Sequence, residues 1–189
     1  MANQNLTGMR VAILATDLFE ESELTEPKKA LEEAGATALV IAPHSGEIQG
    51  VQHDKKSQKV KVDRTLADVK ADDFDAVQIP GGAMNADALR IVPEAQQFVR
   101  EIDAAGKPVA VICHGPWLLI SAGLTKGRKM TSYKTIQDDV RNSGAQWSDE
   151  EYVRNRNWVS SRQPSDIPRF NREMIDLFAE SYHRTRKAA

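Results

Sequence analysis

The chain contains one cysteine, Cys113, in the sequence context of a catalytic nucleophile. A short apolar run, residues 109–112, precedes Cys113, and His114-Gly115-Pro116 follows it before an apolar helical pattern begins. This order predicts a strand, a sharp turn and a helix, an elbow that projects a nucleophile above the strand ends in a strained backbone conformation. The N–H groups and positive dipole end of the following helix favour a thiolate there. The structural alternative is a small buried residue that ends a core strand.

A glycine pair, Gly81-Gly82, follows another apolar run, residues 76–79. Glycine has no side chain, so the backbone N–H groups of Gly81 and Gly82 can approach a substrate oxygen closely. Together with the N–H of His114, they could form an oxyanion hole. The alternative interpretation of the pair is a tight turn and nothing more.

An acidic segment, residues 17–23, follows the first apolar run. Glu20 is the carboxylate of most interest in it, and Asp17, Glu21 and Glu23 compete with Glu20 because spacing does not choose among them. A carboxyl group buried beside a thiolate should have a raised pKa, since burial and like charge both disfavour its ionised form. Such a protonated acid could orient the sulfur and move protons. A solvated acid at a helix N-terminus is the alternative.

The elements that would position these residues alternate between short apolar strands and helices. This rhythm predicts a three-layer α/β/α sandwich with a mostly parallel, flavodoxin-like sheet, and ligands bind such sheets beyond the carboxyl ends of the strands. The residues after each strand should therefore meet at one rim. The predicted strands are 11–15, 37–42, 76–79, 109–112 and 158–160, with a hairpin between 47 and 62, and the predicted helices are 22–34, 93–105, 116–122 and 167–182.

Length and composition limit the classes of protein that the chain can represent. Its 189 residues, 41% of them apolar, predict a single domain over residues 1–189. The net charge is −2, and acidic and basic residues are interspersed along the chain, so no overall electrostatic field favours binding to nucleic acid or to a membrane surface. Residues 1–7 lack the order of a signal peptide, and no apolar stretch is long enough to span a membrane, so we expect a cytoplasmic protein.

Neither a metal nor a cofactor is indicated by the sequence. The remaining histidines, His44, His53 and His183, lie far apart without metal-ligand spacing. No glycine-rich dinucleotide or phosphate loop follows the first strand. We therefore expect no metal site and no cofactor.

Taken together, these segments resemble the intracellular protease I (PfpI) branch of the DJ-1 superfamily, which is related in fold to the class I glutamine amidotransferases. The resemblance covers nearly the whole chain. The matching segments are Phe19-Glu20-Glu21-Ser22-Glu23-Leu24, Ile79-Pro80-Gly81-Gly82, Asn85-Ala86-Asp87-Ala88-Leu89-Arg90, Ile112-Cys113-His114-Gly115-Pro116, Gly127-Arg128-Lys129, Thr131-Ser132-Tyr133 and Asn157-Trp158-Val159-Ser160-Ser161-Arg162.

The resemblance implies roles for four residues. It implies Cys113 as nucleophile, Glu20 as its carboxylic-acid partner and His114 as a third catalytic residue. It also implies a homo-oligomer, at least a dimer, in which Asp87 reaches His114 of the neighbouring subunit. A residue directly after an elbow nucleophile usually contributes its N–H while its side chain points elsewhere, so His114 needs such an orienting partner to act as a base.

Two classes of function fit these residues. In the enzymatic interpretation, Cys113 attacks a small reactive carbonyl or its adduct on a protein, which is glyoxalase III or deglycase chemistry in stress response. Peptide hydrolysis by an intracellular cysteine protease uses the same thiol and ranks lower, because it also needs a groove for an extended chain. In the sensing interpretation, peroxide oxidises Cys113 to sulfenic and sulfinic acid without turnover.

Overall fold

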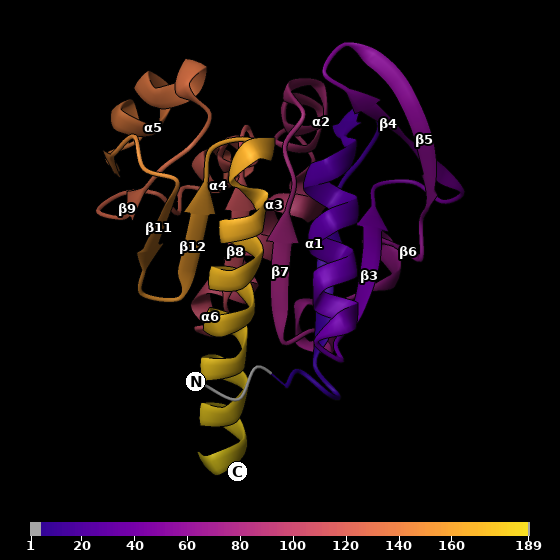
Figure 1. The fold of residues 1–189 in the computed structure, drawn as a ribbon, viewed down its shortest axis with the longest axis vertical. Coiled ribbons are helices and arrows are strands. Elements are labelled where there is room, and N and C mark those ends of the chain that lie inside the picture. Colours follow the sequence, from indigo (N-terminus) through magenta and orange to yellow (C-terminus); the bar gives the residue numbers. More distant parts are fainter. Residues whose placement is uncertain (1–4, 189) are drawn as a thin grey trace.

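A seven-stranded sheet lies at the centre of the computed structural model, which describes residues 5–188, with side chains as far as Arg184 (Figure 1). Neighbouring strands are parallel except β11 and β12, so the prediction of a mostly parallel sheet is confirmed. From one edge to the other the strands are β11 (Tyr152–Asn155), β12 (Trp158–Ser161), β8 (Val109–Ile112), β7 (Ala76–Ile79), β1 (Arg10–Leu14), β3 (Thr37–Ala42) and β6 (Arg64–Thr65).

Helices cover both faces of this sheet and form the predicted three layers (Figure 1). One apolar cluster joins the sheet to α1 (Glu21–Glu33) and α6 (Ile167–Ala188). A second cluster joins the opposite face to α2 (Ala83–Leu89), α3 (Pro93–Ala104), α4 (Pro116–Ser121) and α5 (Gln137–Asn142). The 3₁₀ turns are η1 (Leu66–Asp68), η2 (Ala71–Asp73), η3 (Lys134–Ile136) and η4 (Pro164–Asp166).

A smaller sheet stands beside the carboxyl ends of the central strands, at the upper right of Figure 1. It contains the predicted hairpin, formed by β4 (Glu47–Gln52) and β5 (Lys55–Lys61), and the short strand β2 (Phe19–Glu20) pairs with β4. Two further short strands, β9 (Lys129–Met130) and β10 (Gln146–Trp147), pair with each other. The hairpin is therefore a separate wall rather than an extension of the main sheet.

The parallel order brings the three chemistry-bearing segments together as predicted. The backbone N–H of Glu20, after β1, donates to the carbonyl of Gly81, after β7. Cys113, after β8, lies against the same glycine, because a Cβ at Gly81 would lie 2.6 Å from Cys113 Cβ. Within residues 5–188, no helix is both long enough and apolar enough to cross a bilayer.

Candidate active site

Cys113 occupies the turn between β8 and α4, as the sequence predicts. Its φ of +63° is a left-handed conformation that costs a residue with a side chain on the order of 1–3 kcal/mol. Two backbone hydrogen bonds hold it there, because the Cys113 N–H donates to Ser161 O at 3.1 Å and the Tyr133 N–H donates to Cys113 O at 2.9 Å. Only glycine fits at position 115, where a Cβ would lie 2.9 Å from Ile79 O. The surrounding strands therefore maintain the strain at Cys113.

The carboxylate against the thiol belongs to Glu23 rather than Glu20. Glu23 is fully buried on α1 and interacts with the side chain of Cys113. Its Oε2 accepts the N–H of Gly81 at 2.8 Å, while its buried Oε1 has no conventional hydrogen-bond partner among the described residues. Glu23 is therefore the carboxyl group beside the thiol, and the structure differs from the expectation that Glu20 is the partner of Cys113.

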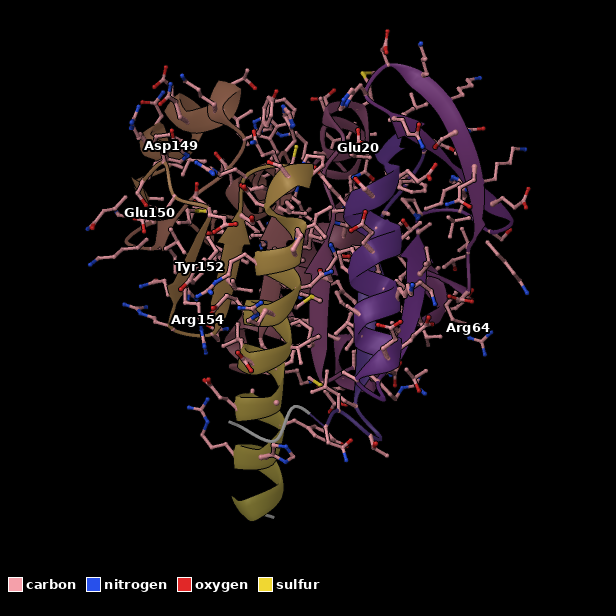
Figure 2. The ribbon with its side chains drawn as sticks, in the orientation of Figure 1. Glu20, Arg64, Asp149, Glu150, Tyr152 and Arg154 are labelled. Carbon is pink, nitrogen blue, oxygen red and sulfur yellow. The ribbon has the colours of Figure 1, made fainter. Side chains whose placement is uncertain are left out.

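Glu20, Asp17 and Glu21 instead bind the β4–β5 hairpin. Each carboxylate accepts one hairpin backbone N–H: Asp17 from Gln49 at 2.8 Å, Glu20 from His53 at 3.0 Å and Glu21 from Gln58 at 3.3 Å. Figure 2 shows Glu20 where the hairpin approaches the carboxyl ends of the main strands. Three of the four competing acids are thus used to hold the hairpin.

Burial is the largest influence on the pKa values of Cys113 and Glu23. It raises the pKa of Glu23 to about 8, with a further contribution from the negative charge of Glu20. Burial also raises the pKa of the Cys113 thiol, as does the carboxylate of Glu23, while the N–H groups of Gly82 and His114 oppose the increase. The helix end alone therefore does not produce the thiolate that the sequence suggested. At neutral pH, Glu23 is largely protonated and can donate its proton to the sulfur.

As the sequence predicts, the glycine pair lets the backbone pass close to the acid and the thiol. The predicted set of three free N–H donors differs, because the N–H of Gly81 already has an acceptor. A Cβ at Gly81 would lie 2.5 Å from Glu23 Oε2 and 2.6 Å from Cys113 Cβ, so no larger residue fits between the acid and the thiol. The N–H groups of Gly82 and His114 are directed to Cys113. Gly81 donates to Glu23 and is not free for an oxyanion.

The imidazole of His114 reaches the sulfur, contrary to the usual geometry of an elbow. Its Nδ1 lies 3.1 Å from Cys113 Sγ, and its Nε2 lies 3.3 Å from Thr135 Oγ1. Ring contacts with Trp117 and Tyr133, at 5.2 and 4.9 Å between centroids, hold the imidazole in this orientation. Burial lowers the pKa of His114, so the ring is neutral at pH 7 and can accept a proton.

A cavity of about 750 Å³ opens above these groups. The hairpin forms one wall, α2 a second, and the segment that leads into α6 a third. Arg162 anchors this third wall through ion pairs of 2.8 Å with Asp149 and Asp166. The lining residues are Leu18, Glu20, Glu23, Val51, His53, Asp54, Lys56, Gly82, Ala83, Met84, Cys113, His114, Tyr133, Gln163, Pro164 and Ser165.

Asp87 lies on α2 with its side chain exposed, outside the residues that line the cavity. In the described part of the chain, no hydrogen bond or ion pair joins it to His114, and Thr135 supplies the nearby hydroxyl instead. The sequence did not single out Thr135. Among the described residues, no group of three His, Cys, Asp or Glu side chains could hold a metal ion.

The strained cysteine, the buried acid and the three-layer fold together define an α/β protein with a nucleophile elbow. Residues 9–177 match the model of the DJ-1/PfpI family, and the chain belongs to that family. Deglycase PfpI of Pyrococcus furiosus is 43% identical over 89% of this chain and 99% of its own length. Protein/nucleic acid deglycase 2 of Escherichia coli is 41% identical over 89% of this chain and 96% of its own.

Solved structures of other proteins share the fold of this chain. A ThiJ/PfpI domain protein from Brachyspira murdochii superposes with a TM-score of 0.84 at 23% identity, over 92% of this chain and 98% of that one. DJ-1 of Schizosaccharomyces pombe superposes with a TM-score of 0.79 at 20% identity, over 93% and 98%. The expected family and fold are thus confirmed.

Proposed function

We propose that this protein is a cysteine-dependent stress-response enzyme that acts on reactive carbonyls, as free dicarbonyls or as adducts on proteins. The observation that carries the proposal is the surroundings of Cys113, where Glu23, the His114 ring and two backbone N–H groups converge on one sulfur. The names of the deglycase relatives support the same class of substrate.

The residues suggest a sequence of steps that needs no external oxidant. The Cys113 sulfur adds to the aldehyde carbon of methylglyoxal, and the carbonyl oxygen takes up a proton, which gives a hemithioacetal. Gly82 and His114 N–H groups stabilise the developing oxyanion. His114 then removes the carbon-bound proton to give an enediolate, and the hydroxyl proton on that carbon passes to the oxygen of the adjacent carbon. Glu23 adds a proton to the adjacent carbon, and a lactate thioester results. Water hydrolyses the thioester to lactate and restores the thiol.

The test compares four reagents on one protein preparation: methylglyoxal, a methylglyoxal-treated peptide, an unmodified peptide and hydrogen peroxide. We expect turnover of free methylglyoxal or of a methylglyoxal-treated peptide, with lactate as product, to exceed any cleavage of an unmodified peptide. Stoichiometric oxidation by hydrogen peroxide, measured by mass spectrometry on the same preparation, tests the sensing alternative. Rapid oxidation without lactate formation from either carbonyl substrate would contradict the enzymatic proposal.

We further propose that Asp87 acts across a homo-oligomer interface. Its exposure on α2, with no hydrogen bond or ion pair to His114 among the described residues of its own chain, fits a group that a neighbouring subunit would use. In a symmetric dimer, one two-fold contact would bring each Asp87 to the partner's site.

Mixing two inactive variants tests this arrangement. Cys113→Ala and Asp87→Ala subunits, denatured and refolded together in equal amounts, should recover about a quarter of the wild-type activity, because half of the dimers are hybrids with one complete site. Each variant refolded alone is the control. Recovery no greater than the sum of the controls, or normal turnover by Asp87→Ala alone, would contradict action in trans.

A further inference from the structure

Asn85, the third residue of α2, is fully buried next to the site, yet it does not line the cavity. Its side-chain Oδ1 accepts the N–H of Thr16 at 2.7 Å. Its Nδ2 donates to Pro80 O at 3.2 Å and to Gly81 O at 2.9 Å. One amide therefore joins the segment after β1 to the segment after β7.

The contacts of Gly81 and Gly82 show why this junction matters. The N–H of Gly81 donates to Glu23, and the N–H of Gly82 is directed to Cys113. Gly82 has a φ of +85°, and a Cβ there would lie 2.6 Å from Leu18 O, so the segment passes through a narrow space. A displacement of a few tenths of an ångström would change both the acid and the thiol contacts.

We propose that Asn85 is a positioning residue, whose side-chain amide fixes the Gly81-Gly82 segment and so holds the backbone donors against Glu23 and Cys113. The other hydrogen bond to Gly81 O, from the Glu20 N–H, is long at 3.3 Å. The two donor hydrogens of Asn85 are therefore the main restraint on the carbonyls of Pro80 and Gly81. Asn85 needs no contact with substrate for this role.

Two substitutions separate this role from simple packing. Asn85→Asp keeps the shape and the acceptor for Thr16 but presents an oxygen to two carbonyl oxygens, while Asn85→Ala removes the amide without adding charge. Thr125→Val is the matched control, because Thr125 is also fully buried and donates one side-chain hydrogen bond, to Ser143 at 2.8 Å, outside the cavity lining.

The main measurement is the rate of alkylation of Cys113 by iodoacetamide as a function of pH, together with the thermal unfolding midpoint. Displacing the Gly82 N–H removes a group that stabilises the thiolate, so both Asn85 variants should shift the alkylation midpoint to higher pH, Asn85→Asp further because of its charge. Thr125→Val should lower the unfolding midpoint and leave the alkylation profile unchanged.

Kinetics with methylglyoxal give a second measurement, which rests on the proposed function. We expect kcat to fall by roughly tenfold or more in the Asn85 variants, since a misplaced oxyanion donor weakens the transition state, with little change in KM. Alkylation requires no turnover, so a wild-type protein that alkylates normally but does not turn over methylglyoxal would contradict only the proposed function. Asn85 variants with wild-type alkylation profiles and lowered unfolding midpoints would overturn the positioning role.

Discussion

Replacing Cys113 with alanine should abolish lactate formation from methylglyoxal and leave a folded protein. The thiol is the nucleophile that forms the covalent intermediate in the proposed reaction, and removal of a nucleophile from a catalytic unit lowers kcat by at least about a thousandfold. The loss of one sulfur atom from a residue that borders a cavity is a small change in packing. Activity should therefore fall far more than stability.

Cys113→Ser is the companion variant, because it keeps an atom that can accept hydrogen bonds from Gly82 and His114. A serine hydroxyl is a much weaker nucleophile at neutral pH, so it should also be inactive with methylglyoxal. Steady-state lactate assays and thermal unfolding of the three proteins give the comparison. Turnover retained in Cys113→Ala would show that the chemistry uses another group.

Glu23→Gln should have the second largest effect, a decrease in kcat of roughly a hundredfold or more through loss of a positioned general acid. Glutamine can still accept the N–H of Gly81, so the geometry of the glycine segment is retained. The variant thiol should titrate in one step, whereas the wild-type thiol and carboxyl titrate as a coupled pair. Alkylation rate against pH and kcat with methylglyoxal are the measurements.

Glu20→Gln is the control, because Glu20 also lies in the cavity wall but accepts the backbone N–H of His53. Its effect on kcat should be much smaller than that of Glu23→Gln. If Glu20→Gln abolished turnover and Glu23→Gln did not, the acid suggested by family resemblance would be the functional one.

Stability against pH provides an independent test of the Glu23 environment. Its pKa is raised from 4.5 to about 8, so the native state binds this proton more tightly than the unfolded chain does. The resulting stabilisation is complete below pH 4.5 and is lost as the pH rises towards 8. Glu23→Gln should remove this loss, and chemical denaturation between these pH values measures it.

The choice among the four acids illustrates what the sequence could not predict. Asp17, Glu20 and Glu21 are occupied by N–H groups of the hairpin, which lies about thirty residues further along the chain. Nothing in the local pattern of the acidic segment encodes that contact. One local signal was available, since Glu23 shares the buried face of α1 with Pro27 and Leu31, at intervals of four residues. An acid on the apolar face of a helix is a sign of a special environment.

The main strands and the elbow were predictable because their signals are local. Buried parallel strands appear as short apolar runs, and the bounds of β3, β7 and β8 agree with those expected from the sequence. The short elements β2, β6 and α5 were not predicted, since two-residue strands and helices of fewer than two turns depend on tertiary contacts. The position of the His114 ring likewise depends on Tyr133, which is distant in sequence.

The attachment of the β4–β5 hairpin has a consequence for how such a protein can evolve. The carboxylates of Asp17, Glu20 and Glu21 hold the hairpin by backbone N–H groups, which every amino acid except proline provides. Side chains near its tip that line the cavity, such as Asp54 and Lys56, can therefore be exchanged without loss of attachment. Selection can thus change this wall of the cavity while Cys113, Glu23 and His114 below it stay constant.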